Sequence, residues 1–163
     1  MILLGVGSNL SVPGIGGPAD VVAAAVRALK EEGVVVAAVS PWYRSAPVPA
    51  SDQPWYVNGV LRVETDLDAP ALLALLHKVE AGFGRVRRQV NEARGLDLDL
   101  LAYHGQVREQ GPQLPHPRMH QRAFVLLPLR DVAPSWRHPL LGLDVAALVA
   151  ALPPGQVTER IGA

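Results

Sequence analysis

Acidic and apolar side chains alternate along residues 96–101, which read Leu96-Asp97-Leu98-Asp99-Leu100-Leu101. In a β-strand, residues two apart point to the same face of the sheet. The alternation therefore predicts a strand over 96–103 that buries leucines on one face and presents Asp97 and Asp99 on the other. Because their Cα atoms would lie roughly 6–7 Å apart, the two carboxylates can converge on one point.

Along the rest of the chain, apolar residues recur with the 3.6-residue period of helices in some segments and with the two-residue period of strands in others. Strands are predicted over 1–6, 34–42 and 56–65, and helices over 18–29, 68–79, 122–132 and 144–152. The order β-α-β-β-α-β, followed by helices, predicts an α+β fold of the ferredoxin-like type. We expect an antiparallel sheet with helices packed on one face and a helical C-terminal extension.

The composition limits the possible functions. The chain has 163 residues, of which 49% are apolar and 18% charged, and this predicts one domain spanning 1–163. Fifteen basic residues balance fifteen acidic ones, so neither nucleic acid nor a membrane is an expected partner. The absence of cysteine excludes disulfides and thiolate chemistry. With no signal peptide or membrane span apparent in the sequence, we expect a cytoplasmic monomer.

The paired aspartates suit a hard divalent cation. Mg²⁺ prefers oxygen ligands and keeps water or substrate phosphates among them, and a two-metal centre with ions about 3.5–4 Å apart matches such a pair. Four arginines precede the strand, namely Arg85, Arg87, Arg88 and Arg94. Because arginine binds phosphate in a bidentate manner, the two features together favour a metal–triphosphate site. Taken singly, each feature is equally compatible with a solvated polar surface.

A flat ring is the expected ligand of a second group of residues. Tyr56 and Asn58 lie two apart on a predicted strand and so share a face, and Asn58 offers both a donor and an acceptor to a heterocycle. Phe124, which follows a segment containing His116 and Arg122, can stack on such a ring. Core packing is the alternative for Phe124. Three histidines are predicted to lie on the surface or on a helix face and are given no functional role, namely His77, His104 and His138.

Six segments in series resemble the 6-hydroxymethyl-7,8-dihydropterin pyrophosphokinase family. They are Gly7-Ser8-Asn9-Leu10, Tyr43-Arg44-Ser45-x-Pro47, Asp52-Gln53-Pro54-x-Tyr56-x-Asn58, Glu80-x-x-x-Gly84-Arg85-x-Arg87, Arg94-x-Leu96-Asp97-Leu98-Asp99 and Pro115-His116-x-x-Met119-x-x-Arg122-x-Phe124. The resemblance implies transfer of the β,γ-diphosphate of ATP to the hydroxymethyl group of the pterin, with release of AMP, in folate biosynthesis.

The resemblance also implies a role for particular residues. Two Mg²⁺ ions would be held by Asp97 and Asp99. The pterin pocket would comprise Ser45, Val48, Tyr56, Asn58 and Phe124. The ATP contacts would be Glu80, Arg85, Arg94, Leu100, His116 and Arg122. The catalytic residues would be Asp97, Asp99, Arg85 and Arg94.

The sequence departs from the family pattern at Val90-Asn91-Glu92-Ala93, where well-known members carry an Arg-Trp pair. We expect the loops at 11–18, 46–54 and 83–95 to act as lids. Two alternatives from other classes remain at this stage. One is a nucleotidyl transferase or cyclase that uses paired aspartates on the same fold, and the other is a nucleic-acid-binding module that uses the arginine-rich loop.

Overall fold

The computed structural model describes residues 1–47, 49–84 and 95–162. Its elements, in chain order, are β1 (Ile2–Ser8), α1 (Pro18–Glu31), β2 (Val35–Val39), β3 (Tyr43–Ser45), β4 (Tyr56–Glu64), α2 (Ala69–Gly82), β5 (Asp97–Tyr103), the 3-10 helix η1 (Met119–Gln121), α3 (Ala123–Val132), α4 (Val145–Ala150) and β6 (Thr158–Arg160).

The strands form one antiparallel sheet in the order β5-β1-β4-β3-β6, with β2 also paired to β4. β1 therefore lies between β4 and β5, so side chains from three segments far apart in the sequence lie next to one another. The predicted antiparallel sheet with packed helices is confirmed. The strand predicted over 96–103 and the helix predicted over 122–132 match β5 and α3 closely.

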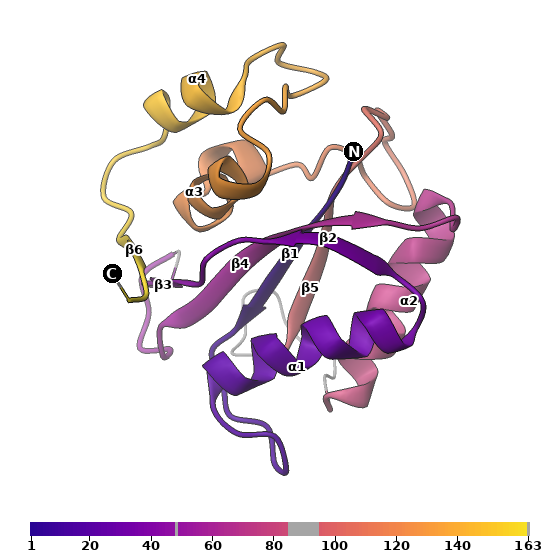
Figure 1. Ribbon diagram of the computed structural model, residues 1–163. Coiled ribbons are helices and arrows are strands. Elements are labelled where there is room, and N and C mark those ends of the chain that lie inside the picture. Colours follow the sequence, from indigo (N-terminus) through magenta and orange to yellow (C-terminus); the bar gives the residue numbers. More distant parts are fainter. Residues whose placement is uncertain (48, 85–94, 163) are drawn as a thin grey trace.

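Helices cover both faces of the sheet, which corrects the expectation of helices on one face only. α1 and α2 lie on one side and α3 and α4 on the other (Figure 1). Helices cover both faces because, along part of each strand, the side chains that point to either face are apolar and are buried by packing helices against them. Leu4 and Leu98 pack towards α1 and α2, whereas Leu3 and Leu101 pack towards α3 and α4.

Local sequence signals set the helix ends. The Oδ1 atom of Asp68 accepts a hydrogen bond from the Ala71 amide at 2.9 Å and caps α2. Asp144 caps α4 in the same way through the Ala147 amide. Gly33, which follows α1, has a φ of +89°, a backbone region that glycine enters without steric cost. Among the described residues, no helix combines the length and apolarity needed to cross a bilayer.

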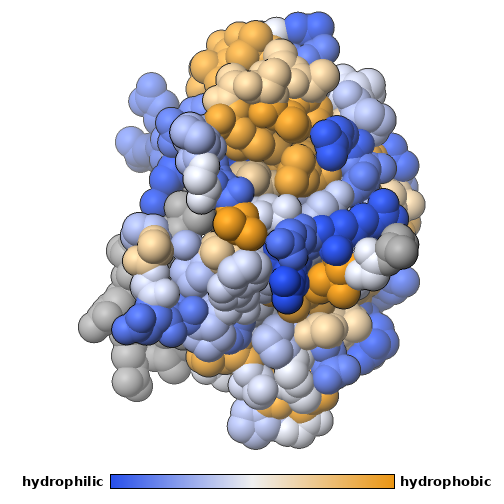
Figure 2. Space-filling view, turned by 90° about the vertical axis from the view of Figure 1, so that its left-hand side faces the viewer, coloured by the Kyte–Doolittle hydropathy of each residue, from blue (hydrophilic) through white to orange (hydrophobic). Residues whose placement is uncertain are grey.

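Three further predictions were wrong. The strand predicted over 34–42 is shorter, because β2 spans only Val35–Val39 and Pro41 has no N–H to donate; pairing with β4 resumes in a separate strand, β3, at Tyr43. The predicted helical C-terminal extension contains α3 and α4, but the segment after α4 also forms β6, which pairs with the edge of β3. His138 is buried, with 3% of its surface exposed, and its Nδ1 atom accepts hydrogen bonds from the Leu140 and Leu141 amides. Figure 2 shows an apolar surface over the nearby α4.

Candidate active site

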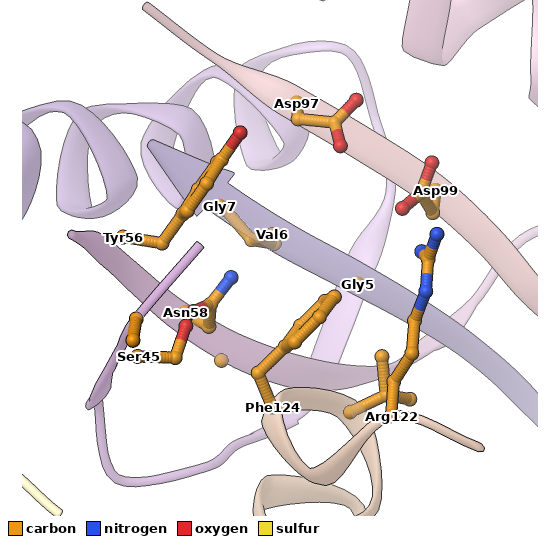
Figure 3. A pocket seen from close by; sticks show the side chains of 13 residues that line it. Gly5, Val6, Gly7, Ser45, Tyr56, Asn58, Asp97, Asp99, Arg122 and Phe124 are labelled. Carbon is orange, nitrogen blue, oxygen red and sulfur yellow. Dashed lines mark hydrogen bonds between the residues drawn. The ribbon is translucent and has the colours of Figure 1, made fainter. Parts of the chain in front are cut away.

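A pocket opens on the α3 side of the sheet, at the end that α3 does not cover. It contains about 660 Å³ of space, part of which is open to solvent. Its lining comes from β1, β3, β4, β5 and the start of α3, and includes Gly5, Gly7, Ser45, Ala46, Tyr56, Asn58, Asp97, Asp99, Arg122 and Phe124. Seven of the predicted site residues therefore meet in one cavity (Figure 3).

The register of the sheet places Asn58, which is predicted to bind a flat ring, across β1 from Asp97, which is predicted to bind a metal ion. Gly7 pairs with Asn58 of β4 on one side and with Asp97 of β5 on the other. Since paired Cα atoms lie about 4.5–5.5 Å apart, Asn58 and Asp97 are separated by roughly 10 Å across β1. A ligand can thus contact the amide at one end and the carboxylate at the other while lying over Gly7.

Glycine forms the floor between these side chains. A Cβ atom at Gly7 would come within 2.8 Å of Asn58 Nδ2, which is closer than packing allows without movement of the amide. Gly5 lies two residues earlier on the same face, and a Cβ there would contact Leu101 and Asp99 at ordinary distances. Gly5 and Gly7 were not among the predicted site residues. Their alternation on β1 is the signal that identifies a pocket floor.

Asn58 is fixed by a neighbouring strand. Ser45 Oγ donates a hydrogen bond to Asn58 Oδ1 at 2.6 Å, and both side chains are buried. This bond leaves the amide nitrogen directed into the pocket (Figure 3). The rings of Tyr56 and Phe124 lie on either side of Asn58 in the same view, so a flat ligand has an amide at its edge and aromatic rings nearby.

Arg122 is the basic side chain that lines the acidic end of the pocket, and His116 lies close enough to be affected by its charge. The Arg122 guanidinium is directed towards Asp99 and lies 5.3 Å from the centre of the Phe124 ring (Figure 3). The pKa of His116 is lowered to about 4, first by burial of the ring and then by the charges of Arg122 and Arg118, while Asp97 acts in the opposite direction. His116 is therefore neutral near pH 7, and its Nδ1 atom accepts a hydrogen bond from the Arg118 amide at 3.2 Å.

Three predicted residues are not among those that line this pocket, namely His116, Leu100 and Glu80. Leu100 is 4% exposed and packs in the core beneath the sheet. Glu80 is 2% exposed, and its Oε2 atom accepts a hydrogen bond from the Leu98 amide at 2.8 Å, which ties α2 to the β5 segment that carries the aspartates. The predicted Val48, Arg85 and Arg94 lie outside the described residues.

The aspartates offer a partial coordination shell for a metal. Both carboxylates project from the same face of β5 into the pocket (Figure 3). Oxygen donors of this kind suit Mg²⁺. Within the described ranges, no group of three or more histidine, acidic or cysteine side chains could hold an ion. The two aspartates thus fit a magnesium site in which phosphate and water oxygens supply the remaining ligands.

The sequence profile of the family described as 7,8-dihydro-6-hydroxymethylpterin-pyrophosphokinase matches residues 3–134. A 2-amino-4-hydroxy-6-hydroxymethyldihydropteridine pyrophosphokinase from Methylorubrum extorquens is 41% identical over 134 residues, which cover 81% of this chain and 82% of the relative. A Synechocystis protein of the same name is 37% identical over 118 residues, 72% of this chain. This chain spans only 60% of the length of the Synechocystis protein.

Solved structures show a similar fold in longer chains. A crystal structure of HPPK-DHPS in complex with substrates aligns with a TM-score of 0.66 at 11% identity and covers 92% of this chain and 42% of its own. HPPK-DHPS from Plasmodium falciparum with pteroate gives the same TM-score at 12% identity and covers 91% and 41%. At such low identity, the similarity is evidence for the fold alone.

Proposed function

The chain belongs to the 7,8-dihydro-6-hydroxymethylpterin-pyrophosphokinase family, and on that basis we propose that it transfers a diphosphate from ATP to 6-hydroxymethyl-7,8-dihydropterin. AMP is the second product, and the reaction is a step of folate biosynthesis. The fold that carries it is of the ferredoxin-like type. The observation that carries the proposal is that Gly7 pairs with Asn58 on one side and with Asp97 on the other. An amide and a carboxylate therefore lie at the two ends of one row of paired residues that runs across the strands.

The aromatic end of the pocket binds the pterin. Phe124 and Tyr56 contact the faces of the ring system, and Asn58 and Ser45 recognise its edge. Because the Ser45 hydroxyl occupies Asn58 Oδ1, the asparagine presents donors to the ligand, and these match the acceptor atoms of a pterin edge. The glycine floor lets the ring lie close to the backbone of β1.

The acidic end binds the triphosphate. Asp97 and Asp99 would hold Mg²⁺, which when bound neutralises phosphate charge and orients the oxygens. Arg122 lies beside this end and stabilises negative charge that develops on the transferred group. His116 is uncharged at pH 7 because its pKa is lowered to about 4, and since its Nδ1 accepts the Arg118 amide, its Nε2 carries the proton and can donate to a phosphate oxygen.

The reaction follows from this arrangement. The pterin hydroxyl oxygen forms a bond to the β-phosphorus, and the bond from that phosphorus to the oxygen shared with the α-phosphorus breaks. AMP departs with that oxygen. Asp97 pairs with Gly7, over which the pterin lies. Its carboxylate orients the pterin hydroxyl and accepts the proton that the hydroxyl loses. Positioning and charge stabilisation supply most of the rate enhancement in such transfers.

An assay for AMP release tests the proposal. The protein is incubated with ATP, and AMP is measured with and without the dihydropterin alcohol and with and without Mg²⁺. AMP formation that requires both additions supports the proposal. AMP formation that ignores the pterin, or ADP as the nucleotide product, would overturn it and point to hydrolysis or to single phosphoryl transfer.

A further inference from the structure

Arg122 occupies a break between two helical segments. The 3-10 helix η1 ends at Gln121 and α3 begins at Ala123, while Arg122 itself is extended, with a φ of −116° and a ψ of +113°. Helix ends leave carbonyl and N–H groups that need partners outside the helix. Arg122 and Phe124 both line the pocket, so the geometry of this break sets the position of two pocket side chains.

The side chain of Gln156 spans the break. Its Oε1 atom accepts a hydrogen bond from the Ala123 amide at 2.8 Å, and its Nε2 atom donates one to the Gln121 carbonyl at 2.8 Å. A carboxamide offers an acceptor and donors from one planar group, so a single rigid unit bonds to both sides of Arg122. The two helical segments are thereby held at a fixed angle to each other.

The same segment of chain also holds the opposite wall of the pocket. Residues 156–160 are here termed the C-terminal strap. Within it, β6 pairs with β3, so that Thr158 lies opposite Ser45. The Ala46 amide donates to the Val157 carbonyl at 3.1 Å. Ser45 and Ala46 line the same pocket as Phe124. The strap lies on the side of the molecule that faces the viewer in Figure 2.

We propose that Gln156 is a positioning residue for the reaction, which holds Arg122 and Phe124 at a fixed distance from the wall formed by Ser45 and Asn58. Gln156 lies beyond residues 3–134, the part of the chain that the family profile matches. The inference rests on the proposed function, because the pocket residues that Gln156 positions are those assigned to the pterin and to ATP.

Two substitutions separate positioning from stability. Gln156→Leu removes both hydrogen bonds with little change in volume. Gln156→Glu keeps an acceptor for the Ala123 amide at the N-terminus of α3, where negative charge is favourable, but it cannot donate to the Gln121 carbonyl. Gln106→Leu is the matched control, since Gln106 is exposed beyond the far end of β5.

The steady-state constants and melting temperatures of the three variants are compared with those of the wild type. Gln156→Leu should lower kcat/KM by about tenfold, as expected for the loss of paired hydrogen bonds that orient reacting groups. Gln156→Glu should also lower kcat/KM, measured well below its melting temperature, because its carboxylate repels the Gln121 carbonyl instead of donating to it. A fall in activity that tracks the fall in melting temperature across both variants would overturn the proposal, as would wild-type activity in Gln156→Glu.

A measurement without turnover separates this inference from the proposed function. In ¹⁵N NMR spectra of the ligand-free protein, Gln156→Leu should speed hydrogen exchange at the Ala123 amide and shift the Arg122 side-chain Nε–H signal, whereas Gln106→Leu should leave both unchanged. Unchanged signals in Gln156→Leu would overturn the positioning role. A wild-type protein that forms no AMP would instead overturn the proposed function.

Discussion

The strands β1, β4 and β5 present side chains to both faces of the sheet, but helices cover the two faces to different extents. On the face towards α1 and α2, apolar side chains run along β1 from Ile2 to Val6 and along β5 from Leu98 to Tyr103. On the opposite face, α3 and α4 cover only the half that carries Leu3 and Leu101, and the other half carries glycines and acidic residues. The comparison teaches that one face maintains the fold, while the uncovered half of the other face carries the chemistry.

The largest effect on activity is expected at the acidic pair. Asp97→Asn, or Asp99→Asn, should lower AMP formation by at least about 10²- to 10³-fold, the range found when one electrostatic stabiliser of a transition state is removed. The melting temperature should stay equal or rise, because two like charges no longer repel each other. AMP release and thermal unfolding are measured on the same samples.

Asp66→Asn is the control for this substitution, because it removes a carboxylate from an exposed turn outside the pocket. Its activity should equal that of the wild type. Near-normal turnover in both Asp97→Asn and Asp99→Asn would remove the reason for assigning the chemistry to the uncovered half of this face.

The second prediction concerns the covered face. Leu4 is fully buried against α1 and α2 and neighbours Gly5, which faces the pocket. Leu4→Ala should lower the free energy of unfolding by about 2–5 kcal/mol, the usual cost of a large-to-small change in a packed core. The kcat of the folded variant should stay close to the wild-type value well below its melting temperature. Urea unfolding and AMP assays together check this result. A large loss of kcat without a loss of stability would mean that the two faces are not separate in function.

The contrast between the faces was partly predictable from the sequence. The shared face of Asp97 and Asp99 follows from the two-residue period of a strand, which is a local property. Tyr56 and Asn58 were predicted to share a face for the same reason, and both line the pocket. The caps of α2 and α4 are also local, since an aspartate bonds to an amide three residues later.

Features that depend on distant residues were not predictable. The role of Gly7 becomes visible only when its pairing with both Asn58 and Asp97 is known. Gln156 contacts backbone groups more than thirty residues away, and no sequence period connects them. The burial of His138 depends on tertiary packing against Trp136 and His120, which a surface-like sequence context does not reveal.

A third prediction uses the chain's two phenylalanines, which are both partly buried but lie on different faces. Phe124→Ala should weaken pterin binding by about 1–3 kcal/mol, a magnitude taken from the stacking of bases on aromatic side chains. Phe83→Ala, at the end of α2, should leave pterin affinity unchanged and lower stability instead. Fluorescence titration with the pterin measures both affinities. Equal affinities for the two variants would make Phe124 a packing residue.

The smallest expected effect is the pH dependence that His116 contributes to stability. Its pKa is about 4 in the folded protein against 6.5 in an unfolded chain. Between these values the unfolded chain binds a proton that the folded protein does not. The contribution is therefore complete above pH 6.5 and is lost as the pH falls towards 4. We expect no more than about 1–2 kcal/mol, because solvent screens the partly exposed ring.

His116→Asn tests this contribution, because asparagine can still accept the hydrogen bond from the Arg118 amide but does not titrate. The free energy of unfolding is measured in urea between pH 4 and 7.5, with an unchanged denaturant slope as the check that one transition is followed throughout. Wild-type stability relative to the variant should decline below pH 6.5. A constant difference would show that burial and the neighbouring arginines do not lower the pKa of His116, and the assignment of an uncharged imidazole near the acidic end of the pocket would lose its basis.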